Sequence, residues 1–295
     1  MWNDLESLAS SASLYAVVIV LGLLWGSFAN VCIYRWPPTD EFPHGRSVVA
    51  PGSHCFACKT PIRWYDNVPL LAWLWLRGRC RACRAPFSPR YLVVEAATGA
   101  LFGLSWWGAV VSQALFQPFT DRLIHFVIYA GFSFVLVVIT FIDLDHKLIL
   151  NKITIPSIAI FYGASFLMPD RQWYDGLVGA AVGYGLPWAI GEIYYRVTHR
   201  EGLGLGDGML LALVGALLGW RGVLVALFGG SVIGSVIGIT ALLVGRDDKP
   251  EAESEVEPES LMRTELPFGP FLAMAALVYL FAEPWIQLHF HLPGG

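Results

Sequence analysis

Two aspartates beside long apolar segments are the residues of this sequence whose type and position best suit acid–base chemistry. Asp143 ends the apolar stretch VLVVITFID, and Asp207 precedes another one within GLGLGDGMLL. Carboxyl groups at the end of one helix and at the start of another face opposite poles of the helix dipole. Two such groups a few ångströms apart would share one proton, so that one activates water while the other protonates a carbonyl oxygen. That chemistry is peptide hydrolysis by a pair of aspartates.

The partner of Asp143 is expected from another helix. Asp145 follows two residues later, which sets the two side chains about 200° apart around a helix. Asp207 is predicted at the same membrane face as Asp143, as a pair requires. Simpler roles fit the same positions, with Asp207 as a helix N-cap and Asp143 as a charge at the membrane interface. Lys147 is near enough in sequence to tune Asp143.

Four cysteines in two C-x-x-C pairs form the second chemical pattern. Cys55 and Cys58 are separated from Cys80 and Cys83 by residues 59–79. Two such pairs can place four thiolates about 2.3 Å from one Zn²⁺, and four sulfurs leave no open position for a catalytic water. We therefore predict a structural zinc site, with disulfides, redox chemistry and free thiols as the alternatives.

The elements that must position these residues are membrane helices. Hydrophobic residues make up 56% of the 295 residues and charged residues 14%, whereas soluble domains are about a quarter charged. Uncharged stretches such as LYAVVIVLGLLWGSFANVCIY can cross about 30 Å of hydrocarbon as helices. We predict an all-α polytopic membrane protein with about eight transmembrane helices, near 14–34, 91–113, 123–142, 153–168, 174–195, 208–220, 222–244 and 267–283.

Basic residues indicate the orientation. The segment 35–90 holds nine of the 19 Lys and Arg residues, and the positive-inside rule places it in the cytoplasm. The preceding 1–34, an N-terminus followed by the first helix, then begins outside. Residues 91–295 are predicted as a transmembrane catalytic core that includes a flexible acidic cytoplasmic loop at 245–266. The reducing cytoplasm favours zinc over disulfides for the cysteine insertion.

Several further residues stand out within the apolar segments. Asn30 and Glu95 are polar groups inside predicted spans, so each serves either packing or substrate contact. Arg90 is the nearest candidate partner for Glu95. No strand precedes Gly204 and Gly206, which argues against a nucleotide-binding loop and favours close helix approach or room for an extended substrate.

Taken in order, these motifs resemble the bacterial type IV prepilin peptidases, bifunctional leader peptidase/N-methyltransferases of pilus and type II secretion systems. The resemblance covers GSFANVCIYR, the paired C-x-x-C motifs, SPRYLVVE, FIDLDHKLILNKITIP, EGLGLGDGMLL and LPFGPFLA. It implies that Asp143 and Asp207 are the catalytic residues of a GxGD-type aspartic protease in the bacterial inner membrane. It further implies cleavage of a short basic leader after a glycine, on the cytoplasmic side of prepilins or pseudopilins.

The same resemblance implies N-methylation of the new N-terminus with S-adenosylmethionine, and contact with pilus or type II secretion machinery. Because no Rossmann-like fingerprint is found, the sequence leaves the methyl-donor residues unassigned, and the cysteine segment is the first place to search. Two other functions stay open: a proton-coupled transporter using Asp143, Glu95 and Asp207, and a non-catalytic assembly component with a zinc-stabilised docking loop. Nucleic acid is not an expected partner.

Overall fold

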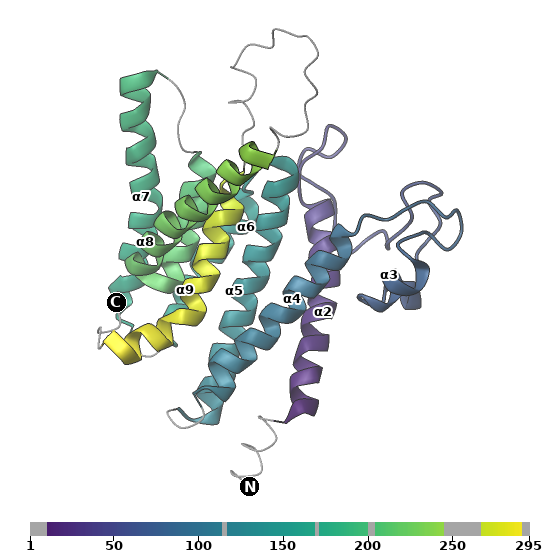
Figure 1. The fold of residues 1–295 in the computed structure, drawn as a ribbon, viewed down its shortest axis with the longest axis horizontal. Helices are drawn as coiled ribbons and strands as arrows, with labels where there is room; N and C mark the ends of the chain where they lie inside the picture. The colour runs from purple at the N-terminus through teal and green to yellow at the C-terminus, as the bar shows by residue number, and fades with distance from the viewer. Residues whose placement is uncertain (1–10, 114–116, 169–170, 200–203, 245–266, 291–295) are drawn as a thin grey trace. The chain divides into compact units, whose positions relative to one another are not determined.

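The computed structural model describes residues 11–113, 117–168, 171–199, 204–244 and 267–290, and these are mostly helical (Figure 1). Among these described residues there are isolated β-bridges but no strands. The chain divides into two compact units, one made mainly of residues up to His146 and one mainly of residues from Lys147 to Ala282. Each unit is described by itself.

The first unit is built on three helices: α2 (Ala12–Arg35), α4 (Arg90–Trp106), which continues as a π-helical turn over Trp107–Val111, and α5 (Phe119–His146). The closest pair is α2 and α4, which approach through glycines. A Cβ atom at Gly26 would lie 2.7 Å from the Cα of Glu95, and one at Gly22 would lie 2.9 Å from the Cα of Gly99. Only glycine permits this helix separation.

The segment between α2 and α4, residues 36–89, is the cysteine loop. It contains a 3₁₀ turn, η1 (Trp64–Asn67), and one short helix, α3 (Leu71–Leu76). The guanidinium of Arg35, at the end of α2, donates to the carbonyl oxygens of Ser47 and Pro51 at 2.9 and 2.6 Å. The loop is therefore tied to the helix from which it emerges.

The second unit contains α6 (Asn151–Ser165), α7 (Trp173–Thr198), α8 (Leu205–Val244) and most of α9 (Gly269–Phe290). A kink divides α8 at Gly219, whose φ of 69° lies in the left-handed region that glycine tolerates. The carbonyl oxygen of Ala216 would lie 2.7 Å from a Cβ atom at Gly176, and Gly179 and Gly215 approach even more closely. The pair α7–α8 is thus packed backbone against backbone.

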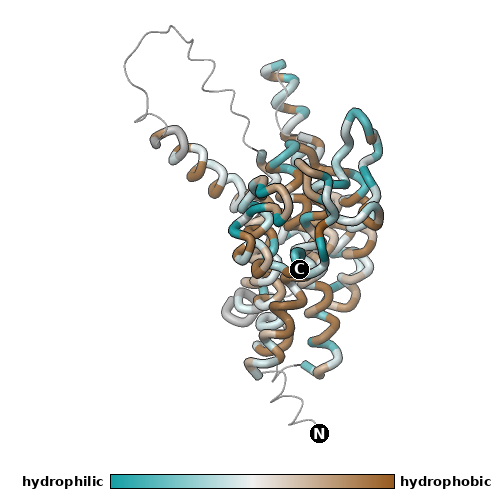
Figure 2. Tube along the Cα trace, turned by 90° about the vertical axis from the view of Figure 1, so that its right-hand side faces the viewer, coloured by the Kyte–Doolittle hydropathy of each residue, from teal (hydrophilic) through white to brown (hydrophobic). Residues whose placement is uncertain are grey.

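The helical, multi-pass character expected from the sequence is confirmed for the described residues, which are mostly helical. Among them, four helical segments are long and apolar enough to cross a membrane: Ala12–Arg35, Arg90–Val111, Phe119–His146 and Leu205–Thr240. Figure 2 shows hydrophobic residues along the helices and hydrophilic ones gathered in connecting segments. The expected boundary between spans 208–220 and 222–244 falls beside the kink at Gly219. The count of eight spans stays a prediction, and the N-terminal residues 1–10 and the acidic loop 245–266 lie outside the described residues.

Candidate functional site

The two cysteine pairs form the same turn twice. In the first, the Cys55 N–H donates to Thr60 O at 3.0 Å and the Lys59 N–H donates to Cys55 O at 2.9 Å. The second turn repeats this pattern, with Cys80 N–H to Ala85 O at 2.8 Å and Arg84 N–H to Cys80 O at 3.0 Å. The residue after each pair adopts a left-handed conformation, with φ of 58° at Lys59 and 60° at Arg84. Each turn thereby presents its two sulfurs to the same side.

The four sulfurs converge at a distance that suits one metal ion. Their ligand atoms all lie within 4.8 Å of one another, with 3.7 Å between Cys55 and Cys83 and 4.0 Å between Cys58 and Cys80. Sulfurs about 2.3 Å from a tetrahedral Zn²⁺ would be about 3.8 Å apart. All four are free thiols rather than disulfides. Hydrogen bonds from the hydroxyl and backbone of Thr60 lower the pKa of Cys58 to about 6, toward the thiolate that binds metal.

Asp143 lies in the last turn of α5 and is only 6% exposed. The last turn of α5 is held in place by Arg90, a residue of α4. The guanidinium of Arg90 pairs with Asp145 at 2.5 Å and donates to the carbonyl oxygen of Phe141 at 3.3 Å. Phe141 and Asp145, two residues before and two residues after Asp143, thus both bind Arg90 of α4. Arg90 therefore holds the end of α5 in position.

The proposed pairing of Arg90 with Glu95 was wrong. Glu95 instead accepts a hydrogen bond at 2.8 Å from the backbone N–H of Leu70, in the cysteine loop. The physical reason is helical geometry, because five residues along a helix turn the side chain by about 140°. Arg90 consequently faces the end of α5, and Glu95 faces the cysteine loop.

Asp207 lies in the first turn of α8, in the second unit. Its backbone N–H donates to Gly204 O at 3.1 Å, and a Cβ atom at Gly204 would lie 3.4 Å from its Oδ2. A Cβ atom at Gly206 would lie 3.1 Å from the Cβ of Ile149, so this glycine serves close packing. Asp143 belongs to the first unit, and its pairing with Asp207, like the influence of Lys147, stays a prediction.

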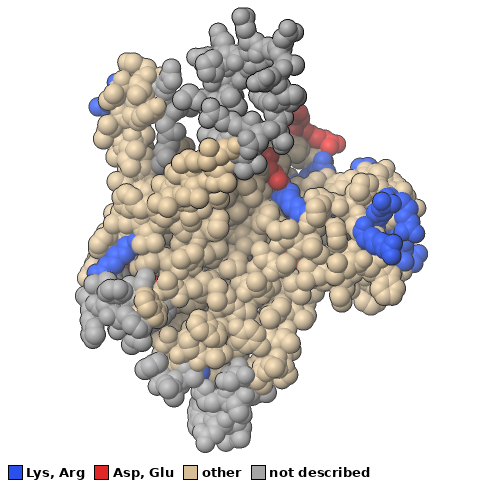
Figure 3. Space-filling view, viewed as in Figure 1, with Lys and Arg blue, Asp and Glu red and all other residues tan. Residues whose placement is uncertain are grey.

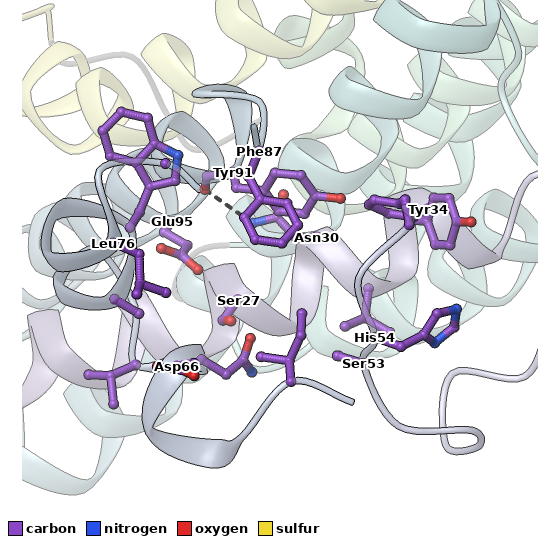
Figure 4. A pocket seen from close by; sticks show the side chains of 18 of the residues that line it. Ser27, Asn30, Tyr34, Ser53, His54, Asp66, Leu76, Phe87, Tyr91 and Glu95 are labelled. Carbon is purple, nitrogen blue, oxygen red and sulfur yellow. Dashed lines mark hydrogen bonds between the residues drawn. The ribbon is translucent and has the colours of Figure 1, made fainter. Parts of the chain in front are cut away.

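Asn30 and Glu95 are brought together at a cavity of about 140 Å³ in the first unit (Figure 4). Asn30 donates to the carbonyl oxygens of Tyr91 at 3.1 Å and Gly26 at 3.3 Å. The cavity is also lined by Trp73 and other aromatic residues that the sequence analysis did not single out. The available signal was the aromatic run LAWLWLRG, which is unusual in a loop so rich in basic residues.

Comparisons with known proteins point to one family. Residues 20–109 match the Bacterial Peptidase A24 N-terminal domain, and residues 130–239 match the Type IV leader peptidase family. Relatives that carry the name prepilin leader peptidase/N-methyltransferase include proteins of the following three species. The protein of Myxococcus xanthus is 34% identical, covering 93% of this chain and 92% of the relative; that of Aeromonas hydrophila is 32% identical, covering 90% of each. The protein of Stutzerimonas stutzeri is 33% identical, covering 94% of each, and no solved structure matches the chain.

Proposed function

Because this chain belongs to the type IV leader peptidase family, we propose that it cleaves prepilins or pseudopilins with Asp143 and Asp207 and then methylates the new N-terminus. The observation that carries the proposal is the match over residues 130–239, which contains both aspartates in their predicted motifs. The names of the relatives favour this enzyme over the transporter and the assembly component.

The proteolytic step needs one ionised and one protonated carboxyl. The ionised group takes a proton from water, and the water oxygen attacks the scissile carbonyl carbon while the second carboxyl protonates its oxygen. Collapse of the tetrahedral species breaks the C–N bond, and the departing amine takes up a proton. Asp143, buried at the end of α5, and Asp207, at the start of α8, are the residues proposed for these roles.

The reaction is proposed at the cytoplasmic face of the inner membrane. Lys and Arg residues gather on the cysteine loop (Figure 3), as the positive-inside rule expects of a cytoplasmic segment. A bond just outside the membrane helix of a prepilin would then be within reach of carboxyls at helix ends.

Two small cofactors complete the proposal. The four-cysteine cluster fits structural Zn²⁺ in its sulfur separations, and a closed shell of four sulfurs would stabilise the loop without activating water. S-adenosylmethionine supplies an electrophilic methyl group when bound, as the N-methyltransferase names of the relatives imply. The cysteine loop lies within the separate N-terminal match over residues 20–109.

The test is the processing of a purified prepilin by the protein in proteoliposomes, with the product weighed by mass spectrometry. Asp143→Asn and Asp207→Asn should each reduce cleavage by at least about a thousandfold, because neither carboxyl acts alone. Asp121→Asn is the matched control, since Asp121 is exposed in the first turn of α5, and it should cleave at the normal rate. Normal cleavage by either of the first two variants would contradict the pair. Proton flux without any cleavage by the unaltered protein would instead support a transporter.

A further inference from the structure

One cavity in the first unit is large enough to hold a ligand and is not used by the proteolytic proposal. It lies between α2, α4 and the cysteine loop and has a volume of about 140 Å³. Since one water molecule occupies about 10–15 Å³ in this measure, the cavity has room for about ten waters. That is the space of a group of about ten non-hydrogen atoms, the size of a purine base, rather than of a single ion or water.

The walls of the cavity are mainly aromatic and aliphatic. Five of the residues that line it carry aromatic rings other than imidazole: Tyr34, Phe56, Trp73, Phe87 and Tyr91. The indole of Trp73 packs directly on Gly78, where a Cβ atom would lie 2.8 Å from Cζ2 of the ring. Several ring faces around one space suit a planar base, and they also attract a cationic centre.

Glu95 supplies the cavity with a carboxyl group that is hydrogen-bonded only to neutral donors. The residue is 8% exposed, and its carboxylate accepts hydrogen bonds from the Leu70 N–H at 2.8 Å and from the Ser27 side chain. Figure 4 shows Glu95 and Ser27 next to each other at the cavity. Both partners are neutral donors, so neither competes with a positively charged ligand for the carboxyl group.

The other charged residues at the walls are already engaged or exposed. Asp66 forms an ion pair with Arg81, and the guanidinium of Arg35 donates hydrogen bonds to carbonyl oxygens of the cysteine loop. His54 contacts Gly52 O at 3.2 Å, and Arg79 is exposed. Glu95 is therefore the one buried acidic side chain among the described lining residues that is not paired with a cation, whereas the buried guanidinium of Arg35 is held by loop carbonyl oxygens.

The wall of the cavity also contains a buried hydrogen-bond donor that is available to a ligand. The indole Nε1 of Trp73 is buried and has no hydrogen-bond partner within the described part of the chain. A buried N–H of this kind costs free energy unless a ligand accepts its hydrogen bond. The side-chain amide nitrogen of Asn30 donates hydrogen bonds to two backbone carbonyl oxygens. Only the side-chain carbonyl oxygen of Asn30 is therefore available to a ligand in the cavity.

We propose that this cavity binds the methyl donor, with the carboxylate of Glu95 facing the cationic sulfonium and the indole N–H of Trp73 binding an acceptor of the nucleoside. The inference rests on the N-methyltransferase activity proposed above. Methyl transfer forms an N–C bond and breaks an S–C bond, while the amine loses a proton and the sulfonium becomes a neutral thioether. A carboxylate at the sulfonium thus favours binding of the donor over the spent product.

Isothermal titration with three ligands tests the charge at this site. S-adenosylmethionine carries the sulfonium, sinefungin carries an ammonium in its place, and S-adenosylhomocysteine carries a neutral thioether. Glu95→Gln keeps an oxygen for the Leu70 N–H but removes the charge. It should weaken both cationic ligands by about tenfold or more and change S-adenosylhomocysteine by less than about twofold. Glu41→Gln is the matched control, because Glu41 is exposed and pairs with Arg46, and it should leave all three affinities unchanged.

Trp73→Phe provides a second, independent test because it removes the indole N–H and keeps a smaller aromatic ring. It should weaken all three ligands alike, by about threefold to tenfold. Metal content and prepilin cleavage serve as the folding check for both variants. Wild-type affinities in both variants, in protein that still methylates, would overturn this cavity while leaving the proposed function intact. Equal loss of all three ligands in Glu95→Gln would overturn the contact with the sulfonium. A wild-type protein that binds none of the ligands and leaves the cleaved product unmethylated would overturn both proposals.

Discussion

The helix pairs α2–α4 and α7–α8 are both packed closely through glycines, but the close packing has a different consequence in each pair. In α7–α8, glycines such as Gly179 and Gly215 bring two backbones together, and the neighbouring side chains on α8 are buried and apolar: Leu210, Leu211, Val214, Leu217 and Leu218. In α2–α4, Gly26 and Gly99 achieve a similar approach. Here, however, the residues one helical turn away are Asn30 and Glu95, and both face the cavity.

The difference shows what close helix approach contributes in each unit. Asn30 is four residues after Gly26, and Glu95 is four residues before Gly99, so each polar side chain lies on the same helix face as its glycine. Removing the Cβ at the glycines lets the two helices bring both polar groups to one place. Around Gly179 and Gly215 the α7–α8 contact is lined on α8 by apolar side chains, so we expect this part of the contact to contribute to stability. The α2–α4 contact should contribute to ligand binding as well as to stability.

Loss of the metal should give the largest effect. Cys80→Ser removes one sulfur from the cluster, and structural zinc contributes on the order of 10 kcal/mol to the folding of small metal-binding segments. We expect metal per chain, measured by mass spectrometry, to fall from about one to near zero. Methylation should be lost because the loop forms one wall of the cavity, whereas cleavage should be largely retained. Cys32→Ser, a buried cysteine of α2 outside the cluster, is the control and should keep the metal.

Adding a methyl group at one glycine of each helix pair should distinguish the roles of the two pairs directly. Gly215→Ala and Gly26→Ala each place a Cβ where the facing backbone lies too close, and overpacking of this kind costs about 1–3 kcal/mol. Both variants should unfold at a lower temperature. Only Gly26→Ala should also weaken S-adenosylmethionine binding, because it moves the backbone of Glu95.

Gly185→Ala in α7 is the matched control, since a Cβ there would meet nothing within 4 Å. It should leave stability unchanged or raise it by up to about 1 kcal/mol, as alanine is the better helix former. Weakened methyl-donor binding in Gly215→Ala as large as that in Gly26→Ala would break the distinction between the two pairs.

The ion pair at the end of α5 should give a smaller effect. Arg90→Gln and Asp145→Asn each remove the same contact, which is about one-third exposed on both sides, and such pairs contribute up to about 1 kcal/mol. Each variant should slow prepilin cleavage by about twofold to fivefold, because the turn that carries Asp143 becomes less fixed. The double variant should be no slower than either single one. Additive losses would show that Arg90 and Asp145 act separately.

The sequence predicted the parts of this fold that depend on local pattern. Apolar length located the helices, the C-x-x-C spacing located the sulfur cluster, and the boundary expected between spans 208–220 and 222–244 fell beside the kink in α8 at Gly219. It could not assign partners across the fold. Arg90 was expected to bind Glu95 because the two are close in sequence, but the side chains leave α4 in different directions. The cavity was missed for a related reason: its walls come from α2, α4 and a loop, and no single segment contains its pattern.

The pair formed by Asp66 and Arg81 should give the smallest effect and a distinct pH dependence. Arg81 hydrogen-bonds to the Asp66 carboxylate and lowers the pKa of that carboxyl below its usual range. A carboxyl whose pKa is lowered by folding stabilises the folded state at pH values above its unfolded pKa, near 3.9. That contribution is lost as the pH falls through the folded pKa. Because the Arg81 side chain is 47% exposed, water and salt screen the pair, and we expect less than about 1 kcal/mol.

Thermal unfolding of wild type and Asp66→Asn can isolate this contribution. The difference between the two proteins should be constant from pH 7 to about pH 5, decrease as the pH falls below about 4, and vanish below the folded pKa of Asp66. It should also shrink when the salt concentration is raised from about 0.1 M to 1 M. Release of metal in acid affects both proteins and cancels in the difference. Glu95→Gln, which alters a buried carboxylate on the same cavity, should respond much less to salt. An equal salt response in both variants would mean that the carboxyl group of Glu95 is screened as strongly as the Asp66–Arg81 pair, whose arginine is exposed. The cavity would then lose the low-dielectric setting in which one carboxylate selects a cationic ligand.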